Sequence, residues 1–306
     1  MRYYFAPMEG LTDRVFRRVH HKYFPGVDAY YMPFLSPTVH RALTPREERE
    51  LPFAGEDGYK AVPQLLTKVA EDFLWMATEC ARRGYEEVNL NLGCPSGTVT
   101  AKGKGSGMLR DPEALDAFLD AIFSKAPLPI SVKTRLGLED AQEFPKILEI
   151  YNRYPIRELT IHPRVRKAFY TGSVDMEMFR YAYGCSKNPL CYNGDLKSKA
   201  DIAQLGEMFP KVEAVMIGRG LIGDPGMFTV GWNKATLQSY CDELLEGYVE
   251  TFGSERNAMF RTKENWGMLI GRFQNHEKLW KRLRKTTDLA QYKAITREIF
   301  DTLELT

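Results

Sequence analysis

Residues 87–96 read Glu87-Val-Asn-Leu-Asn-Leu-Gly-Cys-Pro-Ser96. The first six residues predict a buried strand that ends at Gly93. Cys94 then lies at the carboxyl end of this strand, and the glycine-rich run from Gly97 to Gly107 predicts a mobile loop after it. Most lone cysteines are small buried hydrophobes, but a core residue needs neither the glycine before Cys94 nor the proline after it. The stretch therefore predicts a thiol available for proton chemistry at the end of a strand.

The same alternation of strand and helix recurs on both sides of this stretch. Strands are predicted over residues 3–8, 27–32, 60–66, 87–92, 129–135, 157–162, 189–193 and 212–218. Helices are predicted over 12–23, 68–83, 111–125, 140–152, 175–183 and 198–208, with a long exposed loop over 36–58. Eight strands favour a (β/α)8 TIM barrel. An open doubly wound sheet is the alternative, but no G-x-G-x-x-G follows the first strand.

The pattern changes beyond residue 230, where no strand-like run occurs. Four further helices are predicted, over 238–252, 256–273, 276–285 and 288–304. We therefore predict a catalytic barrel domain over 1–230 and a small all-helical C-terminal domain over 231–306. Residues 256–285 contain nine basic residues against two acids, a local net charge of +7. Such a run indicates either a solvated helix face or a surface that binds nucleic acid.

The composition is typical of a soluble enzyme. Of the 306 residues, 44% are hydrophobic and 27% are charged, and the formal net charge of +2 does not by itself indicate a nucleic-acid-binding protein. The five cysteines lack C-x-x-C spacing, which favours reduced thiols over disulfides or a zinc site. We expect no catalytic metal, because no His, Asp and Glu cluster has ligand spacing. No leader and no apolar run near ~20 residues is evident, so we expect a cytoplasmic protein without a membrane span.

The residues at the carboxyl ends of the predicted strands face the active site in a barrel, and almost every strand from the third onward ends in a polar or charged side chain. The residues at these ends are Pro7-Met8, Gln64, Asn91 with Cys94, Lys133 with Arg135, His162 with Arg164, Asn193-Gly194-Asp195 and Gly218-Arg219-Gly220. Each has a structural explanation when taken alone, but their matching positions indicate an active site at the carboxyl ends of the strands. The last two groups follow strands seven and eight, where barrels commonly bind phosphate. Gln64 suits the imide edge of a flavin, and Lys133 could neutralise charge on a reduced flavin.

These motifs resemble those of the FMN-dependent tRNA-dihydrouridine synthases. The resemblance rests on Ala6-Pro-Met-Glu-Gly10, Asn91 to Ser96, Ser131 to Gly137, His162 with Arg164, Asn193 to Asp195 and Met216 to Gly220. It extends in order over about the first 230 residues. The predicted helix with Arg261, Lys263 and Trp266 is similar, more loosely, to the RNA-binding helical domain of the family.

The resemblance implies that NADPH reduces FMN and that FMN passes a hydride from N5 to C6 of a uridine in tRNA. Cys94 would protonate C5 as the general acid, and an ordinary thiol, with a pKa near ~8.5, carries a proton at neutral pH. The implied FMN-binding residues are Pro7, Met8, Gln64, Lys133, His162, Asn193, Gly194, Asp195, Gly218 and Arg219. The implied base- and tRNA-binding residues are Asn91, Arg135, Arg164, Arg261, Lys263 and Arg284. We expect a monomer.

The chain departs from the family pattern at two places. Pro163 stands where the family often has glycine between His162 and Arg164. A lysine that is frequent after the Cys-Pro pair is absent, although Lys102 and Lys104 lie nearby in sequence. Both departures fall on the expected RNA side, so the target uridine stays open.

Two other functions are compatible with parts of the sequence. One is an FMN barrel that acts on a free pyrimidine, as dihydroorotate dehydrogenases do, but a small substrate needs no basic helical domain. The other is an RNA-binding module without catalysis, which the presence of Cys94, Gln64 and Lys133 disfavours.

Overall fold

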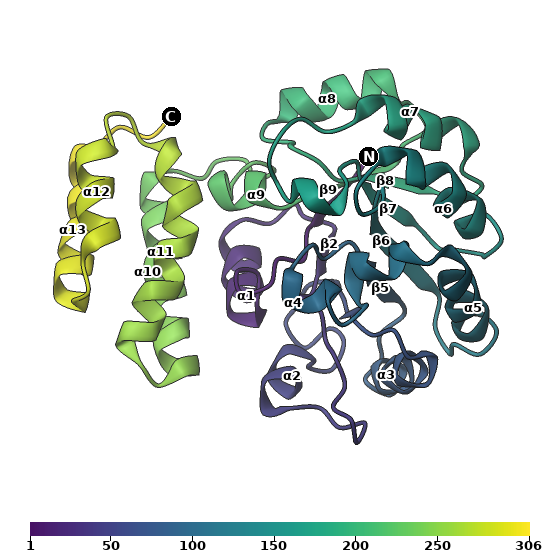
Figure 1. The fold of residues 1–306 in the computed structure, drawn as a ribbon. Helices are drawn as coiled ribbons and strands as arrows, with labels where there is room; N and C mark the ends of the chain where they lie inside the picture. Colours follow the sequence, from purple (N-terminus) through teal and green to yellow (C-terminus); the bar gives the residue numbers. More distant parts are fainter. The chain divides into compact units, whose positions relative to one another are not determined.

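The computed structural model describes residues 1–306, and its centre is a single sheet of parallel strands (Figure 1). The strands are β1 (Arg2–Phe5), β2 (Ala29–Tyr31), β3 (Ala61–Val62), β4 (Gln64–Leu65), β5 (Val88–Leu92), β6 (Ile130–Arg135), β7 (Leu159–His162), β8 (Leu190–Tyr192) and β9 (Ala214–Ile217). They follow the order β3-β2-β1-β9-β8-β7-β6-β5-β4 in the sheet.

The two edge strands of this order, β3 and β4, are consecutive in the chain. Only Pro63 separates them, and proline has no N–H to donate to a neighbouring strand. β3 pairs with β2, β4 pairs with β5, and the N–H of Asn89 donates to the carbonyl of Pro63 at 2.8 Å. β3 and β4 are therefore two halves of the third predicted strand, and the sheet closes into the predicted (β/α)8 barrel.

Helices cover the outside of the barrel (Figure 1). They are α3 (Ala70–Arg82), α5 (Pro112–Phe123), α6 (Phe144–Tyr151), α7 (Met176–Cys185) and α8 (Lys199–Met208). The predicted loop over 36–58 contains a short helix, α2 (Pro45–Glu50), that the sequence analysis missed. Thr44 and Glu47 form a capping box at its start, a local signal that was available in the sequence.

The interior of the barrel has an apolar part and a polar part. A buried cluster of side chains fills the part next to β1, β2, β8 and β9. Its members are Tyr4, Ala6, Ala29, Tyr31, Val62, Cys191, Ala214 and Met216. On β5, Leu90 and Leu92 are fully buried and alternate with the buried Asn89 and Asn91. Because side chains alternate across a strand, the two asparagines lie on the face opposite the leucines, and they belong to the polar part.

The remaining residues form a second compact unit over 8–27, 197–199 and 218–306. Its helices are α1 (Arg14–Tyr23), α9 (Arg219–Gly223), α10 (Lys234–Phe252), α11 (Glu255–Leu269), α12 (Glu277–Lys285) and α13 (Leu289–Thr302). This division differs from the predicted boundary near 230, because the first helix packs on α10. Asp13 caps α1 and accepts a hydrogen bond from Tyr248 at 3.1 Å, and Phe16 meets Tyr240 edge to face.

No helix has both the length and the apolar character that crossing a bilayer requires.

Candidate functional site

Cys94 is partly exposed at the end of β5, whereas Cys80, Cys191 and Cys241 are buried. The side-chain oxygen of Asn91 accepts hydrogen bonds from the backbone N–H groups of Gly93 at 3.0 Å and of Cys94 at 2.9 Å. This turn ends the strand and fixes the backbone that carries the thiol. Cys94 and Cys185 are thus the two cysteines that are not buried, and Cys94 is the one that follows a barrel strand.

The glycine-rich segment after Cys94 folds back against it. The segment contains the short helix α4 (Gly97–Thr100) and the 3-10 helix η1 (Gly105–Arg110). Ser106 donates to the carbonyl of Cys94 from its hydroxyl at 2.7 Å and from its backbone N–H at 3.2 Å. Gly105 has a φ of +58°, and a Cβ there would lie 3.0 Å from the Cβ of Cys94. The expected mobile loop is therefore a folded segment, and Gly105 permits its close approach.

Gln64 and Asn91 form a buried pair of carboxamides beside this turn. Asn91 Nδ2 donates to Gln64 Oε1 at 2.7 Å, and Gln64 Nε2 donates to Asn89 Oδ1 at 2.8 Å. Each of these two amide nitrogens carries a second hydrogen that these bonds do not use. The pair can therefore offer N–H groups to a ligand.

Lys133 lies on β6 in register with Asn91 and is partly buried. Its ammonium group makes no hydrogen bond or ion pair with the chain. Burial lowers the pKa of Lys133 from 10.5 to about 7, and the positive charge of Arg135 also lowers it. The Cys94 thiol lies close enough to influence the same ammonium electrostatically. A site with an unpaired ammonium suits an anionic ligand, because the ligand would supply the missing counter-charge.

Arg135 supports the Cys94 turn from the next strand. Its Nε donates to the carbonyl of Gly93 at 2.9 Å, and its Nη1 donates to the carbonyl of Val165 at 3.1 Å. Its guanidinium lies 5.3 Å from the ring centre of Tyr170, and burial lowers its pKa. The structure thus gives Arg135 a structural contact that the sequence analysis did not predict, and its contact with a base stays a prediction.

Arg164 and Asp195 form an ion pair at the ends of β7 and β8. Arg164 is buried, and its Nη1 lies 3.2 Å from Asp195 Oδ1, with a second, shorter contact from Nη2 to Oδ2. The same Nη1 lies 3.0 Å from His162 Nε2, and Nη2 donates to the carbonyl of Gly172 at 2.5 Å. From the sequence, Arg164 was expected to bind RNA and Asp195 the cofactor, and their pairing was not predicted. Whether either also contacts a ligand stays a prediction.

The remaining predicted cofactor residues occupy two places. Asn193 follows β8, where its Nδ2 donates to the carbonyl of Met216 at 2.7 Å, and a Cβ on Gly194 would lie 2.9 Å from Val174. Pro7 follows β1 in the barrel unit. Met8, Gly218 and Arg219 belong to the second unit. Their joint role in one site with the barrel residues stays a prediction.

Two aromatic residues that sequence reasoning missed lie after β7. Phe169 and Tyr170 follow the 3-10 helix η3 (Arg166–Ala168) and are 44% and 51% exposed. Phe169 has a φ of +48°, an uncommon conformation for a bulky residue, and Arg166 lies 5.7 Å from its ring centre. The signal was present in the sequence, as two adjacent aromatics directly after two basic residues and an alanine.

The second unit gives its three predicted RNA-binding residues different environments. Arg284 is exposed on α12, and Arg261 is partly buried, 3.7 Å from Glu264. Lys263 is buried, and its ammonium donates to the carbonyls of Thr286 and, at 3.4 Å, of Arg284 at the end of α12. The ammonium thus caps a helix, as cations do favourably at carboxyl ends. The sequence did not predict this capping contact, and whether Lys263 also contacts RNA stays a prediction.

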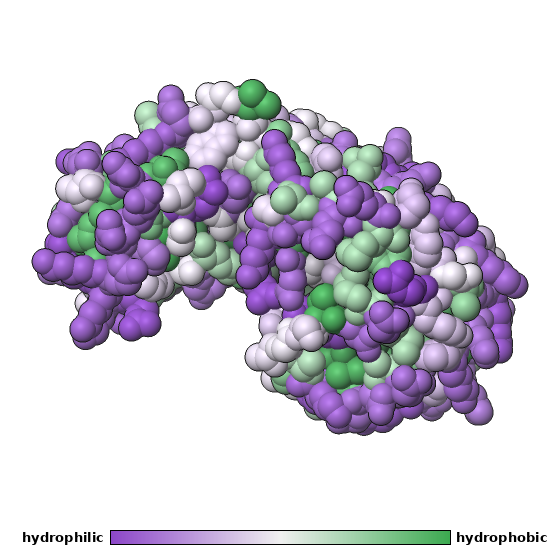
Figure 2. Space-filling view, turned by 90° about the horizontal axis from the view of Figure 1, so that it is seen from above, coloured by the Kyte–Doolittle hydropathy of each residue, from purple (hydrophilic) through white to green (hydrophobic).

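The exposed surface of the second unit is largely hydrophilic on the face shown in Figure 2. The exposed basic residues of α11 and α12 are Arg256, Lys278, Lys281, Arg282, Arg284 and Lys285. Arg282 is paired with Glu298 at 2.8 Å. The basic run therefore provides a set of exposed charges, with part of that charge neutralised within the unit.

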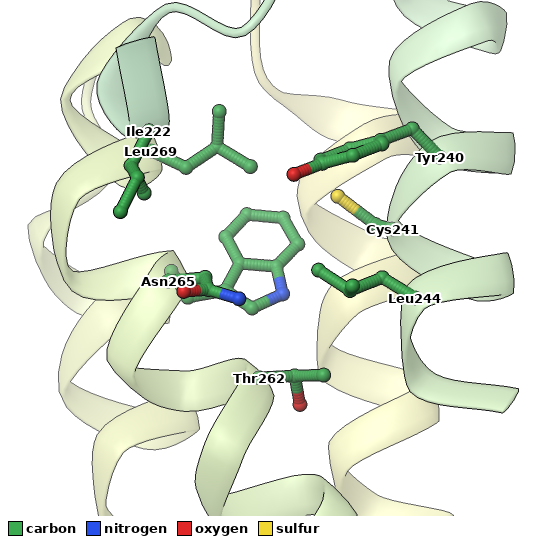
Figure 3. A pocket seen from close by; sticks show the side chains of 8 residues that line it. Ile222, Tyr240, Cys241, Leu244, Thr262, Asn265 and Leu269 are labelled. Carbon is green, nitrogen blue, oxygen red and sulfur yellow. The ribbon is translucent and has the colours of Figure 1, made fainter. Parts of the chain in front are cut away.

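A small cavity lies between α9, α10 and α11 (Figure 3). It is lined by Ile222, Tyr240, Cys241, Leu244, Thr262, Asn265, Trp266 and Leu269. Its lining is mostly apolar and its space suits a water-sized molecule, so it is too small for a nucleotide or a flavin. No group of three or more His, Cys, Asp and Glu side chains is arranged to hold a metal ion.

The chain is similar to known proteins over most of its length. A family model described as dihydrouridine synthase (Dus) matches residues 4–304. tRNA-dihydrouridine synthase B of Pasteurella multocida (strain Pm70) is 30% identical over 230 residues, which cover 75% of this chain and 68% of that protein. A probable tRNA-dihydrouridine synthase of Staphylococcus aureus (strain MRSA252) is 30% identical over 248 residues, covering 79% and 73%. Among solved structures, morphinone reductase has a TM-score of 0.48 and 15% identity over 74% of this chain and 84% of that one.

Proposed function

Because the chain belongs to the dihydrouridine synthase family, we propose that it reduces uridines in tRNA to 5,6-dihydrouridine, with FMN as cofactor and NADPH as reductant. One observation supports this chemistry most directly. A partly exposed thiol at the end of β5 lies near an ammonium that has no counter-ion in the protein. The names of the similar bacterial proteins support tRNA as the substrate.

The residues at the strand ends have the properties that an FMN site needs. Lys133 would face negative charge on the isoalloxazine ring, and the spare amide hydrogens of Gln64 would face its polar edge. His162 and Asn193 would line the same site. FMN, when bound, supplies the hydride that is delivered to C6 of the uracil ring.

Cys94 would supply the proton that completes the reduction. The hydride at C6 and the thiol proton at C5 together saturate the C5–C6 double bond, and the proton is later replaced from solvent. Asn91, Arg135 and Ser106 hold the backbone on both sides of the thiol. This support would keep the sulfur within reach of C5, which general acid catalysis requires.

The RNA would meet exposed aromatic and basic side chains. In the barrel unit, Phe169 and Tyr170 provide ring faces on which bases can stack after the target base leaves its own stack. In the second unit, exposed cations such as Arg284 would contact phosphates. A platform of this kind is useful for a polynucleotide and unnecessary for a free pyrimidine.

The substitution Cys94→Ala tests the proposal. We expect the variant to keep bound flavin and NADPH oxidation and to form dihydrouridine at least ~100-fold more slowly, because general acid catalysis contributes about 10²–10⁴-fold. Dihydrouridine in tRNA is measured by mass spectrometry of digested nucleosides. Cys185→Ala is the matched control, since Cys185 is exposed and outside the site, and it should keep full turnover.

Three outcomes would contradict parts of the proposal. If Cys94→Ala formed dihydrouridine at the wild-type rate, Cys94 would not be the general acid. A purified wild-type protein without flavin absorbance would contradict the cofactor. Turnover of free orotate or uracil, with none of tRNA, would contradict the substrate.

A further inference from the structure

A continuous series of hydrogen bonds runs through the polar part of the barrel, beneath the Cys94 turn. At its upper end, the N–H groups of Gly93 and Cys94 donate to Asn91 Oδ1 at 3.0 and 2.9 Å. Asn91 Nδ2 donates to Gln64 Oε1 at 2.7 Å. Gln64 Nε2 then donates to Asn89 Oδ1 at 2.8 Å. Each carboxamide accepts with its oxygen and donates with its nitrogen.

The series continues below Asn89 and ends at a carboxylate. Asn89 Nδ2 donates to Ser131 Oγ at 2.9 Å, and Ser131 Oγ donates to Glu87 Oε1 at 2.7 Å. Glu87 Oε2 lies 2.9 Å from Arg157 Nε in an ion pair, and the Arg157 side chain is 44% exposed. The series therefore runs from the Cys94 turn to Glu87, which is paired with a partly exposed arginine before β7.

Both ends of the series have a fixed polarity. A backbone N–H can only donate, and a carboxylate can only accept. Ser131 must therefore donate to Glu87, so its oxygen is free to accept from Asn89. Asn89 must then accept from Gln64, and Gln64 must accept from Asn91. Each of the three carboxamides has one orientation that satisfies all of its neighbours.

Burial makes any other orientation costly. Asn89 and Ser131 are 0% exposed, Gln64 is 1% exposed, and Asn91 and Glu87 are each 7% exposed. A rotated carboxamide would face a donor with a donor, away from water that could compensate. The carboxylate of Glu87 therefore fixes the donor and acceptor direction of each hydrogen bond along the series.

We propose that Glu87, Asn89 and Ser131 are positioning residues that set the orientation of Gln64 and Asn91 and thereby hold the Cys94 turn in its reactive conformation. None of the three touches the turn itself, so they act through their neighbours. Glu158 is outside the series, since it bonds instead to Arg2 at 3.0 Å and to Tyr4 at 3.4 Å. The effect on catalysis rests on the proposed function, whereas the effect on the turn does not.

Ser131→Ala removes the hydroxyl that accepts from Asn89 and donates to Glu87, and so interrupts the series. We expect amide hydrogens of the segment 92–96 to exchange about tenfold faster, because the support beneath Asn91 is lost. The kcat for dihydrouridine formation should fall about tenfold, with the KM for tRNA unchanged. Asn89→Asp should give the same result, since a carboxylate accepts from Gln64 but cannot donate to Ser131.

Two further variants separate positioning from general stability. Ser131→Thr keeps the hydroxyl, so the amides of 92–96 should exchange as slowly as in wild type and kcat should be close to the wild-type value. Tyr151→Phe removes a buried hydroxyl on α6 that bonds to Thr134 at 2.9 Å, outside the series. It should lower the melting temperature and leave exchange in 92–96 unchanged.

The exchange experiment can overturn the inference whether or not the enzyme is active. Wild-type exchange of 92–96 in Ser131→Ala would reject it, and so would equal acceleration in Tyr151→Phe. If Ser131→Ala does not fold, Asn89→Asp compared with Ser131→Thr gives the same decision. A wild-type protein that forms no dihydrouridine would reject the proposed function alone, because the exchange measurement needs neither flavin nor tRNA.

Discussion

The end of the barrel and the junction of α11 with α12 each contain a lysine that the sequence analysis assigned to a ligand. At the junction, the ammonium of Lys263 donates to the carbonyls of Thr286 and Arg284. At the barrel, the ammonium of Lys133 has no acceptor in the chain, and burial lowers its pKa to about 7. The two residues look alike in the sequence, and only their acceptors distinguish them.

The difference shows how a structural cation can be separated from a ligand-binding one. An ammonium at the carboxyl end of a helix satisfies carbonyls that the helix leaves unpaired, so it stabilises the fold without a ligand. A partly buried ammonium without a partner destabilises the fold, because its charge is incompletely solvated. Such an ammonium is typical of a ligand-binding site, because a bound anionic ligand supplies the missing counter-charge.

The largest effect is expected from Lys133→Met, which removes the charge and keeps most of the side-chain volume. FMN affinity should fall about 10–100-fold and dihydrouridine formation about 100-fold, because the counter-charge for the flavin is lost. Quenching of flavin fluorescence measures the affinity. Lys133→Arg keeps the charge and should retain part of the FMN affinity and part of the turnover. If Lys133→Met bound FMN as tightly as wild type, Lys133 would not be the ligand-binding lysine of the pair.

The second effect is on stability. Lys263→Met should lower the free energy of unfolding by about 1–3 kcal/mol, because buried carbonyls at the end of α12 lose a charged donor. FMN affinity should not change. Thermal unfolding followed by circular dichroism measures the loss, and Lys278→Met, on the exposed face of α12, is the control. If the two variants were equally stable, the capping role of Lys263 would be wrong.

A pH dependence sharpens the same comparison. The pKa of Lys133 is about 7 in the folded protein and near 10.5 in the unfolded chain, so the unfolded state binds more protons between these values. In flavin-free protein, the contribution of Lys133 therefore makes the free energy of unfolding rise from pH 7 to about pH 10.5. Urea denaturation across this range should give a flatter profile for Lys133→Met than for wild type, and parallel profiles would contradict the lowered pKa.

The smallest effect is expected from Arg284→Ala. An exposed cation that contacts a phosphate adds little to affinity, so tRNA binding should weaken about 2–3-fold. The slope of log affinity against log salt concentration should fall by about 1. Arg282→Ala should have a smaller effect, because Glu298 already neutralises that arginine. Unchanged binding and salt slope in Arg284→Ala would exclude it from the RNA surface.

Much of the architecture could be predicted from local patterns. Eight apolar runs separated by helical periodicity predicted the barrel, although Pro63 divides the third predicted strand into β3 and β4. The position of Cys94 at the end of β5 followed from Gly93 and Pro95. The boundary near 230 did not agree with the compact units, because the packing of α1 on α10 joins residues far apart in sequence.

These local patterns could not predict contacts between side chains from different strands. Arg164 and Asp195 were assigned separate ligands although they pair, and Arg135 was not predicted to bond to the carbonyl of Gly93. Asn89 and Ser131 lie in quoted stretches of sequence, but no role was predicted for either. Their roles depend on strand register, which brings residues 42 positions apart within 2.9 Å.

The sequence by itself determined where the barrel strands and the longer helices fall, and that a thiol, a lysine and several amides lie at the strand ends. These features depend on spacing along the chain, and spacing is local. The tertiary structure alone decided which cations are already paired, which way the buried amides point, and which lysine is left for a ligand. Those properties depend on the acceptors and donors that folding brings within hydrogen-bond distance, and no single stretch of the chain contains both partners.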